Sequence, residues 1–167
     1  MSKTIDDLKA AFAGESQANR RYIAFAKKAE DEDLPQIAKL FRAVAAAETI
    51  HAHNHLRILG EIQSTAENLE AAKGGENYEV DSMYPEFMQD AEQEGEKKAL
   101  TSFKWAWEVE KEHAIFYQEA IDTLKAGLSL PEGDYYICPF CGSTHRGAPP
   151  EKCPVCGTPG KRFERVE

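Results

Sequence analysis

The chain has 167 residues, of which 42% are hydrophobic and 29% are charged, and its formal net charge is −9 at pH 7. This length is sufficient for one domain with a hydrophobic core and a small module beside it. The negative charge argues against a nucleic-acid binder, which needs a basic face for phosphates, and against attraction to an anionic membrane surface.

The N-terminal residues lack the apolar run of a secretory signal, and no segment reaches the length of a membrane-spanning helix. We therefore expect a cytoplasmic protein with no membrane or nucleic-acid partner. Residues 4–128 are rich in Ala, Glu, Lys and Leu, which predicts helix almost throughout. A first helix begins near Thr4, and a polar break at residues 31–34 precedes a second helix that runs from Pro35 to Leu59.

A third helix is predicted to start at Thr65, which can cap it. The glycine pair 74–75 and Pro85 lie within this stretch and predict a kink or an irregular turn. Gly95 separates it from a fourth helix over residues 96–125. Gly and Pro then mark a linker, so the helical part ends shortly after this fourth helix.

Two of the helices carry the same short motif, a Glu followed three residues later by a His. Glu48 and His51 form the first pair, and Glu110 and His113 form the second, each on one face of its helix. A further glutamate precedes each motif, Glu15 by 33 residues and Glu76 by 34. The helices therefore contain a weak internal repeat, in which each half has one Glu and one Glu-x-x-His.

This repeat matches the donor set of bundles that hold two iron or manganese ions. Glu15 would serve from the first helix, and Glu76 or Glu79 from the third. A single Glu-x-x-His in a Glu-rich helix is usually solvent-facing, but two such motifs with partner glutamates favour a metal site. Buried carboxylates in this number also need compensating cations. Tyr22 lies seven residues after Glu15 on the same face, where it packs in the core or orients a ligand carboxylate.

From Tyr135 onward the chain replaces helix formers by Pro, Gly and Cys, which predicts turns and short strands. We predict a helical domain over residues 1–134 and a small domain over residues 135–167. The small domain contains two Cys-Pro-x-Cys-Gly motifs with eleven residues between the pairs, whose ligands would be Cys138, Cys141, Cys153 and Cys156. Two such knuckles close a four-thiolate site, either a structural zinc or a single redox-active iron. Since four thiolates complete this site, His145 is expected at the surface.

These motifs resemble those of the rubrerythrin family over nearly the whole chain. The resemblance is carried by "AFAGESQANRRY", "AETIH", "VEKEH", "GGENYEVDSMYPEF" and "ICPFCG…CPVCG". It implies a mainly α protein, in which a ferritin-like four-helix bundle with two iron ions precedes a rubredoxin-like domain with one iron. Rubredoxin proper has a longer stretch between its knuckles. Zinc remains possible at the cysteine site.

The resemblance also implies roles for individual residues. The ligands to the two irons would be Glu15, Glu48, His51, Glu76, Glu79, Glu110 and His113. Glu48 and Glu110 would bridge the ions, while Glu79 and His51 would exchange as ligands between the oxidised and reduced states. Tyr22 and Tyr84 match tyrosines that lie near the metal ligands in the family.

Members of the family act as peroxidases that reduce hydrogen peroxide to water. The resemblance therefore implies protection against oxidative stress, with electrons passing from rubredoxin or an NAD(P)H reductase through the cysteine site to the bundle. A rival interpretation is a ferritin-like ferroxidase or iron-handling protein with a zinc ribbon as a staple. A purely structural interaction module would not explain the inward carboxylates.

The short connection between the second and third helices predicts a homodimer with exchanged helix pairs. In a ferritin-like bundle this connection must cross the length of the bundle. The second helix, with about 25 residues at about 1.5 Å each, is about 37 Å long. Residues 60–64 reach only about 17 Å when fully extended. The third helix would therefore continue into a second molecule, unless the chain forms a simple up-down-up-down bundle.

Overall fold

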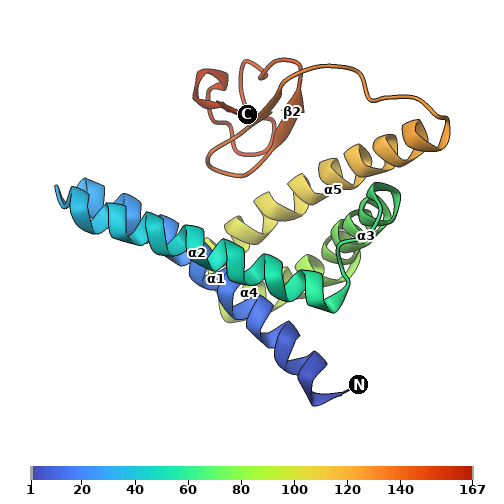
Figure 1. The fold of residues 1–167 in the computed structure, drawn as a ribbon. Coiled ribbons are helices and arrows are strands. Elements are labelled where there is room, and N and C mark those ends of the chain that lie inside the picture. Colours follow the sequence, from blue (N-terminus) through green and yellow to red (C-terminus); the bar gives the residue numbers. More distant parts are fainter. Residues whose placement is uncertain (1, 167) are drawn as a thin grey trace. The chain divides into compact units, whose positions relative to one another are not determined.

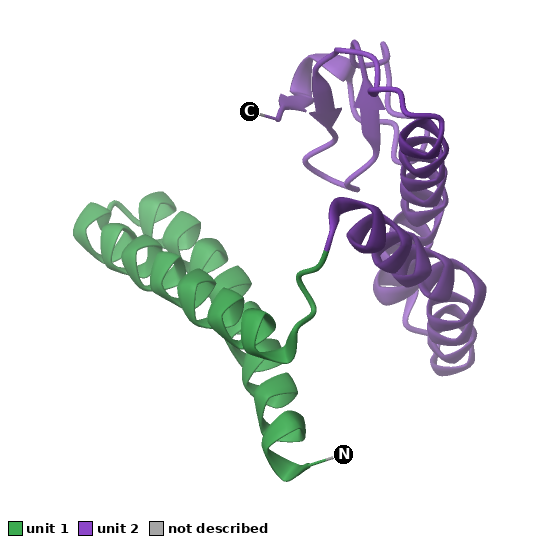
Figure 2. Cartoon of the chain, turned by 45° about the vertical axis from the view of Figure 1, so that its right-hand side comes forward, with its two compact units in different colours: residues 1–63 green, residues 64–167 purple. Residues whose placement is uncertain are grey.

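The computed structural model describes residues 2–166 and divides into two compact units (Figure 1, Figure 2). Unit 1 spans Met1–Gln63 and unit 2 spans Ser64–Glu167. Unit 1 is a pair of long helices, and unit 2 contains the remaining helices and all strands. Among the residues that the structure describes, no helix is long and apolar enough to cross a membrane.

Unit 1 is a helical hairpin in which α1 (Lys3–Asp31) and α2 (Pro35–Leu59) run side by side (Figure 2). The predicted break and both ends of α2 are confirmed, because Pro35 begins the helix and Gly60 ends it with a φ of 71°. Small side chains allow the two helices to approach closely, since the buried apolar residues are Ala26, Ala29, Ala38, Ala45 and Ala52. Buried Asn19 joins the helices by donating its amide to the Ala45 carbonyl at 2.7 Å and to Thr49 Oγ1 at 2.9 Å.

The helices of unit 2 are α3 (Thr65–Tyr78), the π-helical turn η1 (Glu79–Met83), α4 (Tyr84–Glu94) and α5 (Lys97–Lys125). The predicted cap is one residue off: Ser64 caps α3 in a reciprocal pair with Glu67, and Thr65 is the first helical residue. The predicted irregularity is present but does not lie at the glycine pair, which stays within α3. It lies at η1, after which Pro85 occupies the first turn of α4.

The π-turn accounts for the one-residue difference between the two halves of the repeat. Glu76 follows Glu15 by 61 residues, whereas Tyr84 follows Tyr22 by 62. A π-turn is a one-residue insertion in an α-helix, and η1 lies between Glu76 and Tyr84. Beyond it the halves match again. Tyr22 lies 6.3 and 6.2 Å from the rings of two phenylalanines, and Tyr84 lies 6.4 and 6.3 Å from two others, each 62 residues later; the four are Phe25, Phe41, Phe87 and Phe103.

A tryptophan on α5 stabilises this turn. A π-turn lengthens the backbone hydrogen bonds by one residue and so leaves a carbonyl without its usual helical partner. The indole Nε1 of Trp107 donates to the carbonyl of Val80, inside η1, at 2.9 Å. The inserted residue is therefore held in place by a side chain from the neighbouring helix.

We expect Trp107→Phe to destabilise η1, because the Val80 carbonyl loses its donor while the aromatic ring is kept. A half-buried acceptor without its partner costs roughly 1–2 kcal/mol. Hydrogen–deuterium exchange should quicken at residues 79–83, and the free energy of unfolding in urea should fall by that amount. Trp105→Phe on the same helix is the control. Equal exchange rates at residues 79–83 in the two variants would contradict the assignment.

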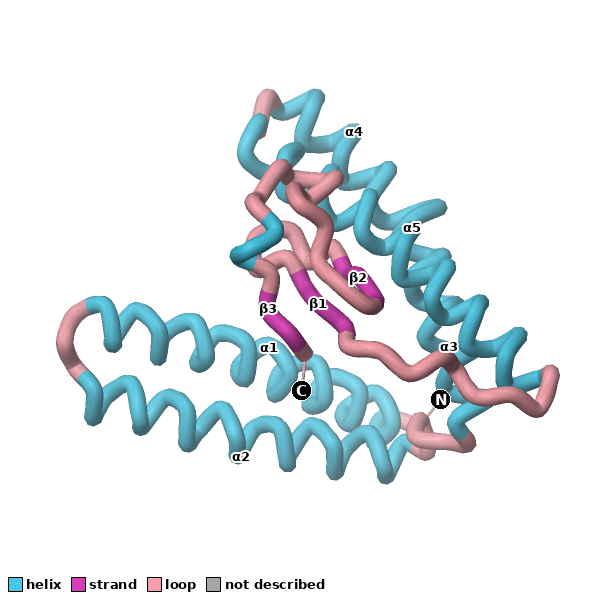
Figure 3. Tube along the Cα trace, turned by 90° about the horizontal axis from the view of Figure 1, so that it is seen from above, coloured by secondary structure: helices cyan, strands magenta, loops and turns pink. Residues whose placement is uncertain are grey.

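The rest of unit 2 is a small module formed by residues 135–166, here called the four-cysteine module. Its strands are β1 (Tyr135–Ile137), β2 (Thr144–Arg146) and β3 (Glu164–Arg165), antiparallel in the order β2-β1-β3. A short 3-10 helix, η2 (Gly160–Arg162), precedes β3. Strand β2 lies against α5 of the same unit (Figure 3). The predicted turns and short strands are confirmed.

Candidate metal centres

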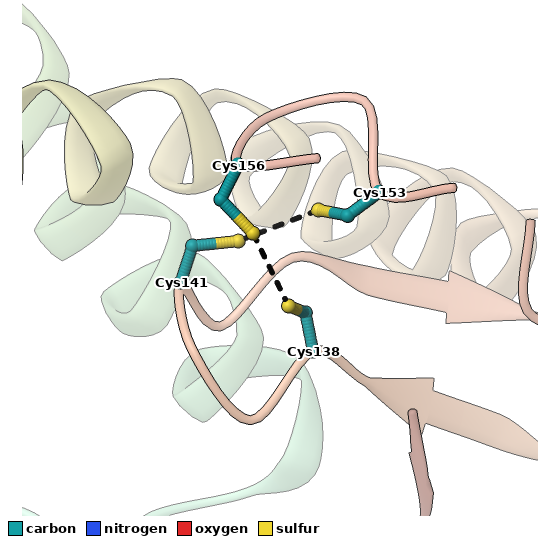
Figure 4. A group of neighbouring side chains, drawn as sticks. All are labelled: Cys138, Cys141, Cys153 and Cys156. Atoms are coloured by element: carbon teal, nitrogen blue, oxygen red, sulfur yellow. Dashed lines mark hydrogen bonds between the residues drawn. The ribbon is translucent and has the colours of Figure 1, made fainter. Parts of the chain in front are cut away.

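The four cysteines of the module form one cluster, with Sγ atoms all within 4.8 Å of one another (Figure 4). Cys138 and Cys141 come from the knuckle that follows β1, and Cys153 and Cys156 come from the second knuckle. The sulfurs pair across the knuckles at 3.5 Å, Cys138 with Cys156 and Cys141 with Cys153. This donor set fits a single tetrahedral metal ion.

The sequence after each Cys-x-x-Cys explains how a knuckle forms. Gly142 and Gly157 have φ values of 84° and 80°, a left-handed conformation that glycine adopts without strain. The amide of Gly142 donates to the Cys138 carbonyl at 2.9 Å, and Gly157 donates to the Cys153 carbonyl at 3.0 Å. The repeated glycine is therefore required by the turn that brings two sulfurs together.

The pKa shifts of the four clustered thiols favour a bound cation. Burial alone would raise the pKa of Cys138, but amide donors from Phe140 and Cys141 and the neighbouring thiols lower it to about 7. Burial, together with hydrogen bonds that favour its neutral form, raises the pKa of Cys141. Ionisation of the Cys138 thiol is thus favoured, and ionisation of the Cys141 thiol is opposed. A bound cation removes this opposition, which is why metal binding to such sites releases protons.

Glutamates and histidines form two further clusters, one in each unit. In the unit 1 cluster, Nδ1 of His51 lies 2.8 Å from Glu48 Oε2 and 3.9 Å from Glu15 Oε1. In the unit 2 cluster, Nδ1 of His113 lies 2.6 Å from Glu110 Oε2 and 3.9 Å from Glu76 Oε2. The two clusters therefore have nearly the same geometry. Each offers two carboxylates and one imidazole, a donor set that suits iron.

The unit 2 cluster is strongly polarised. Burial raises the pKa of Glu76 to about 7, and the hydrogen bond and negative charge of Glu110 add to the shift. The hydrogen bond from His113 lowers the pKa of Glu110, and the same bond raises the pKa of His113. The carboxylates thus compete for limited positive charge, which a divalent cation would provide. The residues present fit a metal ion.

Three other predicted residues, Glu79, Tyr84 and Tyr22, have different surroundings from the residues of these clusters. Among the described residues, Glu79 is not part of the unit 2 cluster, although burial and the charge of Glu110 raise its pKa. Burial raises the pKa of Tyr84, and the nearby Glu79, Glu110 and Glu76 carboxylates raise it further. Tyr22 packs between phenylalanines at the equivalent place in unit 1. Within the described residues, the structure thus gathers six of the seven predicted helix ligands into two groups, one in each unit.

One histidine differs from the sequence expectation. His145 is half-buried rather than at the surface, because its ring packs 5.5 Å from Phe163 and its Nε2 lies 3.0 Å from Ser143 Oγ. The alternating pattern of β2 contained the signal for this, since Thr144 and His145 point to opposite faces of a strand.

Family models describe both parts of the chain. The model for rubrerythrin matches residues 6–121, and the model for the rubrerythrin rubredoxin-like domain matches residues 136–164. The chain belongs to the rubrerythrin family. Rubrerythrin-2 of Clostridium acetobutylicum is 37% identical to it, covering 96% of this chain and 95% of the relative. Nigerythrin of Nitratidesulfovibrio vulgaris is 38% identical, covering 98% and 86%.

Solved structures agree with this assignment to the rubrerythrin family. Fully reduced, all-ferrous nigerythrin matches 99% of this chain and 88% of its own, with 36% identity and a TM-score of 0.59. The expected fold class is confirmed: a mainly helical, ferritin-like rubrerythrin domain with a rubredoxin-like region. The chain carries the carboxylate residues of a diiron site and a rubredoxin-like four-cysteine site. Its membership supports an iron-dependent oxidoreductase of oxidative-stress protection.

Proposed function

We propose that this member of the rubrerythrin family is a peroxidase that reduces hydrogen peroxide to water. The observation that carries the proposal is the presence of two matching carboxylate–histidine clusters together with a four-thiolate cluster. When bound, two ferrous ions at the helix site would supply the two electrons for cleavage of the O–O bond, and iron at the cysteine site would supply their replacements singly. A ferroxidase would not need a cysteine site that supplies electrons.

The residues proposed to hold the helix irons differ in exposure, and this supports different roles. Glu48 and Glu110 are shielded, with side-chain exposures of 15% and 17%, and each is hydrogen bonded to its own histidine. These properties suit fixed, bridging ligands. His51 is 54% exposed, and Glu79 stands apart from the unit 2 cluster. Neither is held as closely within its own unit as Glu48 and Glu110 are, and this supports exchange between the two as ligands. Glu15, Glu76 and His113 would complete the set.

Tyrosines would assist this site by orienting its carboxylates. The shifted pKa of Tyr84 supports a position near Glu79, so its hydroxyl can donate to that carboxylate and hold it beside the metal. Tyr22 would act in the same way on the other half. We keep the proposed domains at residues 1–134 and 135–167. Four free thiols suit a reducing compartment, which favours the cytoplasm, with a rubredoxin or an NAD(P)H reductase as electron donor.

We further propose that the site forms between two chains that exchange helix pairs. Each cluster lies within one unit, and only residues 60–64 join α2 to α3. Large apolar side chains of the hairpin remain outside its alanine core, and Leu40, Ile50 and Ile58 are more than 60% exposed. A partner's helix pair would cover such a face and complete the ligand set. Reciprocal exchange closes a two-fold dimer with two identical sites.

We expect His113→Ala to reduce iron loading at the helix site and leave the cysteine iron intact. The variant removes a ligand, so the affinity should fall by at least about tenfold, the lower limit for changing residues that merely orient ligands. Iron content and visible absorption of the full-length protein measure the two sites separately. His53→Ala, which removes an exposed histidine, is the control. Full loading of the helix site in His113→Ala would contradict the ligand assignment.

The peroxidase proposal itself is tested by mixing the fully reduced protein separately with peroxide and with dioxygen. Peroxide should oxidise the helix irons first, and the red colour of the ferric four-thiolate site should then appear as its ferrous iron is oxidised. A colourless cysteine site that contains zinc, with faster oxidation by dioxygen, would instead indicate a ferroxidase with a structural zinc.

A further inference from the structure

The four-cysteine module contacts α5 along a single face of the helix. The contacting residues of α5 are Val109, Glu112, His113, Phe116 and Glu119, which recur at helical spacing. At one end, a β-carbon on Gly142 would lie 3.9 Å from Val109, which is only 2% exposed. At the other end, Arg146 Nη2 donates to a Glu119 carboxylate oxygen at 2.9 Å. The module is thus seated on the helix that carries the unit 2 cluster.

The centre of this contact includes a proposed metal ligand. Oγ1 of Thr144, on β2, lies 3.1 Å from Nε2 of His113. Next to it, Ser143 is fully buried and donates its hydroxyl to a Glu112 carboxylate oxygen at 3.2 Å. The second nitrogen of His113, Nδ1, faces Glu110 and Glu76 in the unit 2 cluster. His113 therefore touches the cluster with one nitrogen and the module with the other.

The hydrogen bonds of Thr144 favour a proton on Nε2 of His113. A threonine hydroxyl has one proton to donate. Thr144 donates it to the carbonyl of Gly142 at 3.0 Å, so its oxygen can only accept a proton from Nε2 of His113. When a metal ion takes the place of the hydrogen bond from Nδ1 to Glu110, the imidazole keeps its proton on Nε2, where Thr144 accepts it. A metal ion needs this tautomer.

We propose that Thr144 is a positioning residue that fixes His113 as an Nδ1 ligand and joins the four-cysteine module to the cluster of its own chain. The inference rests on the proposed function for its metals, but its geometry is independent of the oxidant. In a dimer with exchanged helix pairs, each module would serve the site that contains its own α5.

The same contacts form a continuous connection between the two proposed metal sites. His113 donates to Thr144, Thr144 donates to the Gly142 carbonyl, and Gly142 follows Cys141 in the knuckle. Iron bound at the two sites would supply one-electron chemistry, and the residues of this connection would link the ligands that hold it. The Nε2 proton stays on the imidazole, so no proton needs to move with the electron.

The test compares Thr144→Val, which keeps the shape but loses the acceptor, with Thr144→Ser, which keeps the hydroxyl. The full-length chain is loaded with zinc, and the ring nitrogens of its histidines are observed by NMR. The Nε2 proton of His113 should exchange with water at least severalfold faster in Thr144→Val, and Thr144→Ser should restore the slow exchange. The more exposed His51 provides an internal reference. Thr144→Ala, measured in parallel, repeats the loss of the acceptor with a smaller side chain.

A control variant weakens a different contact between the four-cysteine module and α5. Glu119→Gln weakens the ion pair with Arg146 and should leave the exchange of the His113 proton unchanged. In the iron-loaded protein, reduced and mixed with peroxide, oxidation of the cysteine iron should be severalfold slower in Thr144→Val than in Glu119→Gln. Unchanged proton exchange in both Thr144→Val and Thr144→Ala would overturn the proposal. Peroxide that leaves the wild-type cysteine iron reduced, with the NMR result as expected, would refute the peroxidase and not the role of Thr144.

Discussion

A Glu48→Ala chain and a His113→Ala chain, unfolded together and refolded, are expected to form mixed dimers in which about half of the helix sites bind iron normally. In exchanged dimers each site combines α1 and α2 of one chain with α3 and α5 of the other. One site of the mixed dimer then receives both lesions, and the other site receives none. Each variant refolded alone has one lesion in every site.

Iron content per dimer and peroxide oxidation of the reduced mixture measure the recovery. An affinity tag on one chain allows the mixed dimers to be separated from the parent homodimers. A Glu48→Ala chain mixed with a Glu15→Ala chain is the matched control, because both substitutions lie in unit 1. Every site of that mixed dimer then contains one substituted ligand. Mixed dimers of the first pair without intact sites would show that each chain builds its own site.

The Cys153→Ser/Cys156→Ser double variant is expected to lose the red four-thiolate site and all turnover that depends on a reductase. Metal binding to such a site contributes on the order of 10 kcal/mol to the folding of a small domain. Without two of its ligands, the four-cysteine module should therefore unfold and release its contacts with α5. The helix irons, reduced chemically beforehand, should still be oxidised once by peroxide.

Two measurements on the double variant separate loss of electron supply from loss of the helix site. Iron content should fall only by the ion of the cysteine site, and single-turnover oxidation by peroxide should keep its full amplitude. Glu151→Gln, which alters an exposed side chain of the module, should retain colour and turnover. Reductase-linked turnover that persists in the double variant would show that electrons reach the helix site by another route.

The helix positions and the grouping of candidate ligands could be predicted because each depends on neighbours in the sequence. Pro35 and Gly60 set the ends of α2, and the spacing of Glu48 from His51 puts both on one face. The glycine after each Cys-x-x-Cys likewise predicted the knuckles. The individual ligand roles and the domain boundaries stay predictions.

Features that depend on distant partners were not accessible in this way. Gly74 and Gly75 are the obvious helix breakers, yet α3 continues through them. The irregular turn begins at Glu79 instead, where Trp107, 27 residues after Val80, donates to the freed carbonyl. Thr144 and His113 are 31 residues apart. The residues around Trp107 and Thr144 in the sequence do not indicate either of these contacts.

The π-turn also makes the two halves of the repeat chemically unequal. Two copies of one helix pair would give a centre whose two ends are interchangeable. Glu79 has no carboxylate counterpart in α1, since the residues 61 and 62 positions earlier are Ala18 and Gln17. The single inserted residue therefore coincides with an additional acid on one side only. The two ends of such a centre therefore differ in their available carboxylates, and a reaction at it would begin at one defined end.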